Sequence, residues 1–383
     1  MKPKHIHFLS CINYAQWGGS EELWSQTAIA LKNRGHKISA SVGSLMTKSP
    51  NCINMTDKGI SVLGRTPVRF QRAKNIIYNE ILRQHLDFQR NALKRWLSKN
   101  PPDLIVINQP TNHDSSEWLE FLDALSIPYV IISHAATDSQ WPSDYTASRL
   151  RKLYSKSLCN YFVSNHNHRL TEWQIGCPIQ NFKIVFNPYK VTFFQEFKWV
   201  SENDIPRLGV VARIEPHSKG HDLLLLAIHE LNKTEFQARF SIYGSGGNLD
   251  TIARMIQRLG LSNVSIEGYV NDIHKIWSNQ EMLLLPSRSE GLPLSLVEAA
   301  LCGRPAIVTD VGGNTELVED GVTGYVIEAR EVYAVVSCLK RAITDRKEWQ
   351  NMGKEMMKKA RSIIPKNPAS DFSNILESVL LNL

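Results

Sequence analysis

The sequence lacks the patterns that mark several common classes of protein. Its six cysteines form no Cys-x-x-Cys pair and no zinc-binding spacing. No apolar run approaches the roughly 20 residues that a membrane-spanning helix needs. The N-terminus has too short an apolar centre for a secretory signal, and neither a low-complexity segment nor a dinucleotide-binding Gly-x-Gly-x-x-Gly occurs. These absences argue against a disulfide scaffold, a zinc domain and a helical membrane protein, and they favour a cytoplasmic protein with reduced thiols.

The composition is that of an ordinary globular protein, with 43% hydrophobic and 21% charged residues. A chain of 383 residues is long for one domain, so two domains are expected. The net charge of +7 is unevenly spread, because residues 1–190 carry 23 Lys and Arg against 13 Asp and Glu. The basic excess therefore belongs to the first half of the chain.

Much of that excess lies in residues 65–99, which hold nine basic residues against two acidic ones. Isoleucine and leucine recur at helical spacing between 76 and 86, so a basic amphipathic helical region is predicted. Contact with an anionic membrane or an anionic acceptor is one interpretation, and a solvated basic face over a core-packed stripe is the other. No nucleic-acid module accompanies the charge, so we expect no nucleic-acid partner.

Short apolar runs alternate with helical patterns along both halves of the chain. Such alternation predicts parallel strands joined by crossover helices. The pattern stops after Asn187-Pro188 and resumes at Leu208, beyond a polar segment closed by Pro206. We expect an α/β chain of two tandem Rossmann-like, doubly wound domains, residues 1–190 and 191–365, the first completed by a C-terminal helix at about 366–383. Strands are expected at residues 5–9, 37–42, 104–107, 129–133, 161–163 and 183–186, and then at 208–212, 238–243, 264–267, 282–285, 306–309 and 325–327.

The stretch Ser287–Gly303 carries two acids in different environments. It follows a short apolar strand and opens a helix with Pro293 in its first turn. Glu298 shares a helical stripe with Leu294, where a carboxylate is costly unless it is hydrogen-bonded. Glu290 lies in the loop at the strand's carboxyl end, where open α/β sheets bind ligands. A helix-start acid held by local amides is the alternative interpretation.

Two basic residues flank the loop after the first strand of the second half. Arg213 and Lys219 are six positions apart across that turn, so both could reach one diphosphate. The amides of Gly291 to Leu294 would add partial positive charge at the same sheet edge. Solvated loop charges are the alternative interpretation.

Other loops at carboxyl ends provide weaker candidates. Gly18-Gly19 lies between a strand and a helix, which is typical of an anion-binding turn. His134 directly follows a strand, where a capping role is the commoner one. Tyr243-Gly244 and Tyr269-Val270 could frame a base, or could simply pack.

The run from Glu290 to Glu298, Glu-Gly-Leu-Pro-Leu-Ser-Leu-Val-Glu, resembles the signature of glycosyltransferase family 4. Arg213 with Lys219 is similar to that family's diphosphate-binding pair, Gly18-Gly19 to its first-domain glycine loop, and His134 to a histidine on the sugar side. The resemblance is dense over residues 205–328 and thinner over 1–190. Alanine follows His134 where the family commonly has an acid, which leaves the acceptor side less defined.

The resemblance implies a GT-B fold, with two domains facing a central cleft, and a retaining, metal-independent hexosyltransferase without a cofactor. Such an enzyme would move a hexosyl unit from a UDP- or GDP-linked sugar to a hydroxyl of a glycan or glycolipid in cell-surface polysaccharide or lipopolysaccharide synthesis. It would act in the cytoplasm, with peripheral contact at the inner face of the plasma membrane. A nucleotide-sugar hydrolase or epimerase, and a non-catalytic nucleotide-sugar-binding subunit, are the alternatives. The implied catalytic residues are Arg213, Lys219, His134 and Glu290, and the implied donor-binding residues are Gly18, Gly19, Tyr243, Gly244, Tyr269, Val270, Gly291, Leu292, Pro293, Leu294 and Glu298.

Overall fold

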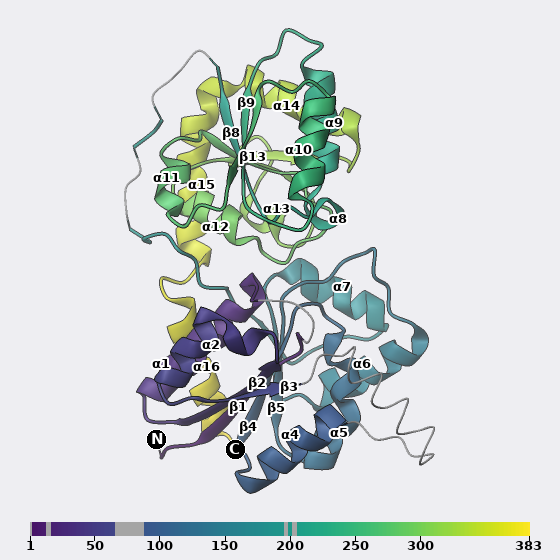
Figure 1. Ribbon diagram of the computed structural model, residues 1–383, viewed down its shortest axis with the longest axis vertical. Helices are drawn as coiled ribbons and strands as arrows, with labels where there is room; N and C mark the ends of the chain where they lie inside the picture. Colours follow the sequence, from purple (N-terminus) through teal and green to yellow (C-terminus); the bar gives the residue numbers. More distant parts are fainter. Residues whose placement is uncertain (1, 13–16, 66–87, 195–197, 201–204) are drawn as a thin grey trace. The chain divides into compact units, whose positions relative to one another are not determined.

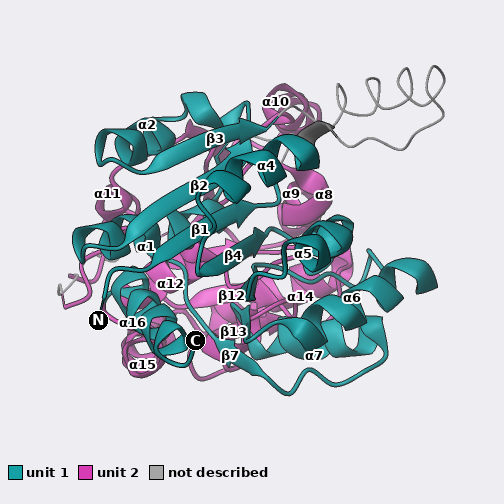
Figure 2. Ribbon diagram, turned by 90° about the horizontal axis from the view of Figure 1, so that it is seen from below, with its two compact units in different colours: residues 1–188, 367–383 teal, residues 189–366 magenta. Residues whose placement is uncertain are grey.

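The computed structural model describes residues 2–12, 17–65, 88–194, 198–200 and 205–383 (Figure 1). The chain divides into two compact units, which Figure 2 shows in different colours. Unit 1 comprises residues 1–188 and 367–383, and unit 2 comprises residues 189–366. Each unit is a parallel α/β sheet covered by helices, which confirms the predicted fold class.

Unit 1 is built on a seven-stranded sheet of order β3-β2-β1-β4-β5-β6-β7 in which neighbouring strands run parallel. Strand β3 is not predicted by the sequence pattern, because it is a short edge strand in which serine, glycine and arginine interrupt the apolar run. The strands are β1 (His5–Ser10), β2 (Lys37–Gly43), β3 (Ser61–Arg65), β4 (Leu104–Gln109), β5 (Tyr129–Ser133), β6 (Asn160–Phe162) and β7 (Phe182–Ile184).

Helices cover both faces of this sheet, as the alternating side chains of β4 make plain. Leu104 and Val106 join a core cluster with α1, α2 and α16, whereas Ile105 and Ile107 join a second cluster with α4, α5, α6 and α7. A strand that is buried on both faces is predominantly apolar, and residues 104–107 of β4 form such an uninterrupted apolar run. The helices of unit 1 are η1 (Gly19–Glu21), α1 (Glu22–Asn33), η2 (Met46–Lys48), α2 (Pro50–Asp57), α4 (Phe88–Lys99), η3 (Asp114–Trp118), α5 (Leu119–Leu125), α6 (Asp144–Lys156), α7 (Asn165–Ile175) and α16 (Pro368–Leu381).

The C-terminal helix α16 returns from unit 2 to pack on α1. Phe372, Leu376 and Leu380 enter the unit 1 core, and Glu377 forms an ion pair with Arg34 at 2.7 Å. Burial of these three apolar side chains is worth about 1.5–3 kcal/mol each, so α16 is an integral part of unit 1.

Unit 2 has a six-stranded parallel sheet of order β10-β9-β8-β11-β12-β13. Its strands are β8 (Arg207–Val211), β9 (Arg239–Tyr243), β10 (Val264–Gly268), β11 (Met282–Leu285), β12 (Ala306–Thr309) and β13 (Gly324–Ile327). Its helices are α8 (Pro216–Lys219), α9 (His221–Leu231), α10 (Leu249–Arg258), α11 (Ile273–Trp277), α12 (Leu294–Leu301), α13 (Asn314–Leu317), α14 (Val332–Thr344), η4 (Arg346–Glu348) and α15 (Trp349–Ile363).

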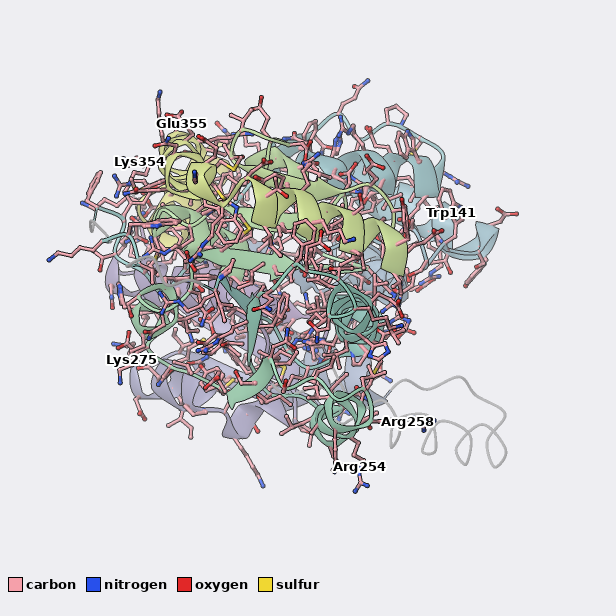
Figure 3. The ribbon with its side chains drawn as sticks, turned by 90° about the horizontal axis from the view of Figure 1, so that it is seen from above. Trp141, Arg254, Arg258, Lys275, Lys354 and Glu355 are labelled. Carbon is pink, nitrogen blue, oxygen red and sulfur yellow. The ribbon has the colours of Figure 1, made fainter. Side chains whose placement is uncertain are left out.

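Helix α10 shows how sequence periodicity orients a surface helix in this unit. Ile252 is buried in the core, while Arg254 and Arg258 are exposed and point outward (Figure 3). One apolar stripe against the sheet and a charged outer face are the arrangement expected of a covering helix.

The basic region expected at 65–99 is described only in part. Residues 66–87, which include the apolar stripe at 76–86, lie outside the described residues. In α4, which closes the region, Leu93 and Leu97 are buried in the core of unit 1, and Lys94, Arg95 and Lys99 are exposed. The described part of the region thus packs its leucines into the core and exposes its basic side chains, which is compatible with both interpretations of the region. No helix in the described ranges is long and apolar enough to cross a membrane.

Candidate functional site

The loops after β8 and β11 meet at the carboxyl edge of the unit 2 sheet, because β8 and β11 are parallel neighbours. The backbone oxygen of Ser218 accepts hydrogen bonds from the amides of Arg288 (2.8 Å) and Ser289 (3.2 Å). Gly220 has φ +68°, and a Cβ there would lie 2.1 Å from the Pro286 oxygen. Only glycine fits that contact, so the short helix α8 is held directly against the loop after β11.

Lys219 and Glu290 form a salt bridge at this junction. The Lys219 Nζ lies 2.8 and 2.7 Å from the two Glu290 carboxylate oxygens. The Ser287 hydroxyl donates to Glu290 Oε1 at 2.8 Å. The Lys219 and Glu290 side chains are 16% and 6% exposed, so the two charges compensate each other where little water reaches them. The structure therefore brings together two of the four residues that the sequence implied for catalysis.

Glu298 is buried on α12 with an exposed fraction of 4%. Its Oε1 accepts a hydrogen bond from the backbone amide of Lys190 at 3.0 Å. Burial raises the pKa of Glu298 to about 7, an effect that the Lys190 amide opposes. The buried carboxylate predicted on this stripe thus has a hydrogen-bond donor but no ion pair within the described ranges.

Helix α12 begins immediately after the loop that carries Glu290. Pro293 is its N-cap residue and provides no side-chain hydrogen bond to the first amides. The first amides of a helix have no intrahelical partner, so this start is suited to a negatively charged ligand. Gly291 and Leu294 are half-buried, and Leu292 and Pro293 are buried.

Two further loops fix the backbone around this helix start. Gly244, with φ +148°, approaches the Ala212 oxygen so closely that a Cβ would be 1.9 Å away. Gly312 has φ +55° and leaves no room for a Cβ beside the oxygens of Glu290 and Gly291, both at 2.4 Å. The loops after β8, β9, β11 and β12 therefore form one backbone-packed edge.

Arg213, also in the loop after β8, has a side chain that is 67% exposed and lies 2.9 Å from Glu215 Oε1. Exposure of this degree makes the ion pair a weak one, since water competes for both groups. Breaking this ion pair to bind a ligand would therefore cost the Arg213 guanidinium little free energy.

The two tyrosine loops differ in how their side chains are used. The Tyr243 hydroxyl accepts a hydrogen bond from Gln280 Nε2 at 2.9 Å, so it already has a partner within unit 2. Tyr269 is 63% exposed, and Lys190 Nζ lies 3.2 Å from its hydroxyl and 5.8 Å from its ring centroid. Val270 beside it is half-buried. Tyr269 with Lys190 offers an open aromatic platform, whereas Tyr243 does not.

In unit 1 the predicted residues lie at the carboxyl edge of the other sheet. Gly18 precedes η1 with an extended backbone, and a Cβ there would meet only Ser20 Oγ, at 3.9 Å. Gly19 is the first residue of η1, which leads into α1. His134 follows β5 and is 5% exposed, and its Nε2 lies 2.7 Å from Asn108 Oδ1. Burial lowers the pKa of His134 to about 3, so the ring is neutral at physiological pH.

The sequence analysis missed two buried residues that belong to this edge. Glu21 is fully buried, and its Oε1 accepts from Asn108 Nδ2 at 2.7 Å. Glu21 is the last residue of η1, two positions after Gly19, and Asn108 is the first polar residue of β4, after the apolar run 104–107. Polar residues at the ends of central strands are the signal that could have found them.

No group of three or more His, Cys, Asp or Glu side chains within the described ranges is arranged to hold a metal ion. In the loops of the unit 2 edge, the buried acid Glu290 already has Lys219 as its cation. A metal-independent site stays a prediction.

The chain has two parallel α/β sheets in tandem, and the loops at their carboxyl edges could bind ligands. This arrangement is the GT-B class of fold. Residues 192–359 match the family described as "Glycosyl transferases group 1". The chain thus carries a group 1 glycosyltransferase domain, which contains the Lys219–Glu290 junction and Glu298.

Curated relatives extend this similarity. The chain is 32% identical over 127 residues to poly(ribitol-phosphate) alpha-N-acetylglucosaminyltransferase of Staphylococcus aureus, covering 33% of this chain and 26% of that one. It is 35% identical over 270 residues to the GtfA subunit of a UDP-N-acetylglucosamine--peptide N-acetylglucosaminyltransferase of Streptococcus pneumoniae, covering 64% and 52%. The matched part thus spans about a quarter to a half of the length of these relatives.

Among solved structures, Anabaena Alr3699/HepE in complex with UDP-glucose superposes with a TM-score of 0.74 at 18% identity. The match covers 98% of this chain and 100% of that one. Similarity at this identity is evidence for the fold over the whole chain.

Proposed function

We propose that this protein is a retaining glycosyltransferase that moves a hexosyl unit from a UDP-linked sugar to a hydroxyl of a glycan or glycolipid. The observation that carries the proposal is the pair Glu290 and Glu298, two acids more than nine-tenths buried on either side of the α12 start. They lie within the residues that match the glycosyltransferase family, at the sheet edge where α/β proteins bind ligands.

Glu298 is suited to the ribose of the nucleotide. A carboxylate accepts two hydrogen bonds from adjacent hydroxyls, and a nucleoside offers such a pair. Its Oε1 already accepts from the Lys190 amide, which fixes its orientation without filling all its acceptor capacity. The nearby Tyr269, exposed and flanked by Lys190, would stack on the base.

The diphosphate would lie between the α12 start and the basic side chains of the loop after β8. The α12 amides, Lys219 and Arg213 would stabilise the negative charge that grows on the leaving diphosphate, where fixed donors act most strongly. Lys219 is paired with Glu290 in this structure, so a bound donor would share that cation. Glu290 would then accept from a hydroxyl of the transferred sugar.

No protein nucleophile is needed for retention in this scheme. The acceptor hydroxyl attacks the anomeric carbon on the face from which the diphosphate leaves, and a phosphate oxygen takes its proton. The residues of the chain bind, orient and stabilise charge, and exclusion of water suppresses hydrolysis of the donor.

The acceptor class follows from the names of the relatives, and the location follows from the charge of unit 1. The names of the relatives describe transfer to a poly(ribitol-phosphate) and to a peptide, so we expect a polymeric acceptor. We expect action in the cytoplasm, with peripheral contact of unit 1 at an anionic membrane through the basic face of α4.

The test begins with donor binding and ends with transfer. A thermal-shift panel of UDP-, GDP- and ADP-sugars should show stabilisation by UDP-sugars, because binding raises stability by mass action. Release of UDP should then require an acceptor extract, and Glu298→Gln should reduce the shift at a fixed UDP-sugar concentration while the exposed control Glu235→Gln keeps it. Release of UDP without acceptor would identify a hydrolase or epimerase, and binding without turnover would identify a non-catalytic subunit.

A further inference from the structure

One residue of unit 2 contacts both Glu298 and Tyr269. The Lys190 backbone amide donates to Glu298 Oε1 at 3.0 Å, and the Lys190 Nζ lies 3.2 Å from the Tyr269 hydroxyl and 5.8 Å from the centre of the Tyr269 ring. Glu298 is buried, whereas Lys190 and Tyr269 are exposed. Lys190 therefore joins the acid proposed for the ribose to the aromatic ring proposed for the base.

The segment that carries Lys190 is anchored on unit 2 at both of its ends. The Tyr189 hydroxyl lies 3.1 Å from the Pro365 oxygen and 2.9 Å from the Lys366 oxygen. Arg361 Nε donates to the Phe193 oxygen at 3.1 Å. Because the backbone is held on either side of Lys190, the Lys190 side chain starts from a fixed point beside Glu298.

The polar groups around the Tyr269 ring have defined hydrogen-bonding roles. The Tyr269 hydroxyl donates to Asn271 Oδ1 at 3.3 Å, so its oxygen accepts from Lys190 Nζ. Asp272 Oδ1 accepts from the His274 amide at 3.1 Å, at the start of α11. An ammonium has N–H donors and no acceptor, so Lys190 can only donate to a ligand on this ring.

A donor of this kind distinguishes between two pyrimidine bases. Uracil has a carbonyl oxygen at ring position 4, as thymine has, whereas cytosine has an amino group there. The carbonyl oxygen accepts a hydrogen bond from an ammonium, but the amino group is itself a donor. An ammonium at that edge of the base therefore attracts uracil and disfavours cytosine, which is how one group achieves specificity.

We propose that Lys190 selects the base of the nucleotide, by donating a hydrogen bond to the position 4 oxygen of a uracil that stacks on Tyr269. This inference rests on the proposed function, because it assumes that a nucleotide binds at Glu298. It adds the residue that makes the donor a uridine nucleotide. The preference for one base over another is measurable without an acceptor and without turnover.

Calorimetric titration of the full-length chain with UDP and with CDP tests this selection. The two ligands share ribose and diphosphate, so the ratio of their dissociation constants cancels the contributions of Glu298 and of the diphosphate-binding residues. The wild type should bind UDP about tenfold more tightly than CDP, which is at the lower end for discrimination between bases because Lys190 is exposed.

Two substitutions of Lys190 change the hydrogen-bonding role of the side chain. Lys190→Glu replaces a donor by an acceptor, so CDP should bind more tightly than UDP. Lys190→Gln can donate or accept when its amide turns, so the ratio should approach one. The negative charge of Lys190→Glu should weaken both nucleotides equally, and both variants keep the backbone amide that donates to Glu298.

Lys354→Glu is the matched control. Lys354 is exposed on α15 and points outward, so this variant makes the same change of charge away from Tyr269 (Figure 3). Its ratio of UDP to CDP affinity should equal that of the wild type.

Equal affinity of the wild type for UDP and CDP would overturn the selection by Lys190. A preference for UDP that persists unchanged in both Lys190→Glu and Lys190→Gln would overturn it as well. Either result leaves the proposed function standing, because a nucleotide still binds. A wild-type chain that binds neither nucleotide would defeat the proposed function, and this inference with it.

Discussion

Replacing Glu298 with glutamine should make the ligand-free chain more stable at alkaline pH and weaken its binding of UDP. Burial raises the pKa of Glu298 from 4.5 to about 7, so the folded state binds a proton more tightly than the unfolded state does. Burial of Glu298 therefore leaves the free energy of unfolding unchanged below about pH 4.5, where the carboxyl is protonated in both states. The same burial lowers the free energy of unfolding progressively as pH rises through 7. Glutamine stays neutral and retains a carbonyl for the Lys190 amide.

The size of the effect follows from the shift. At about 1.4 kcal/mol for each pH unit, the advantage of Glu298→Gln over the wild type should grow by about 2–3 kcal/mol between pH 5 and pH 8. For a unit of this size that corresponds to roughly 5–10 °C in melting temperature. Loss of the charged acceptor should weaken UDP binding by about 1.5–3 kcal/mol, which is about ten- to a hundred-fold.

Thermal melts of both proteins at pH 5 and pH 8, with and without UDP, measure these quantities together. The difference in melting temperature between the two proteins at each pH excludes the contribution of Glu21, whose pKa is also raised and which both proteins contain. Equal melting temperatures of Glu298→Gln and the wild type at both pH values would refute the claim that burial destabilises the ionised Glu298 carboxylate. A variant that gains stability but binds UDP normally would remove Glu298 from the ribose site.

Three other substitutions probe the same sheet edge. Arg213→Ala should fold normally, because the side chain is 67% exposed, yet lower kcat by about a hundred- to a thousand-fold in a steady-state transfer assay; near-normal turnover would exclude its diphosphate role. Lys219→Met leaves Glu290 buried without its cation and should cost about 3–5 kcal/mol in denaturant unfolding at pH 8; an unchanged free energy of unfolding would contradict the ion-pair explanation. Gly220→Ala should lower the melting temperature of the chain, because its Cβ would sit 2.1 Å from the Pro286 oxygen, and an unchanged melt would show that the contact can relax.

Much of the fold follows from local patterns in the sequence. Uninterrupted apolar runs such as 104–107 predict strands buried on both faces, and β4 is such a strand. Strand β3 escapes prediction because an edge strand needs only one partner and tolerates Ser61, Gly64 and Arg65 in five residues. The other edge strands, β7, β10 and β13, keep enough apolar residues to be predicted, so β3 is missed because of its composition and not only because of its edge position.

The site was predictable as a set of positions but not as a set of contacts. Glu290 and Glu298 stand out because they flank a helix start, which is a local feature. The partner of Glu290 is Lys219, 71 residues away, and the partner of Glu298 is the backbone amide of Lys190. Neither contact has a local sequence signal, since the first joins two loops that parallel strands bring to one edge and the second joins α12 to the segment that opens unit 2.

The buried acids of this chain separate into two kinds, and the difference points to where ligands act. Glu281 is 1% exposed near the amino ends of the unit 2 strands, and Arg346 at 2.8 Å and Arg207 at 3.9 Å compensate its charge. Glu21 and Glu298 are as deeply buried at the carboxyl edges, yet neither forms an ion pair within the described ranges. Packing alone gives no reason to keep a desolvated carboxylate without a cation, since an apolar side chain of similar volume would cost less. Glu281 is therefore explained by the fold, and the buried Glu290 has Lys219 as its cation. Glu298 has no such cation within the described ranges, which supports its proposed contact with a ligand.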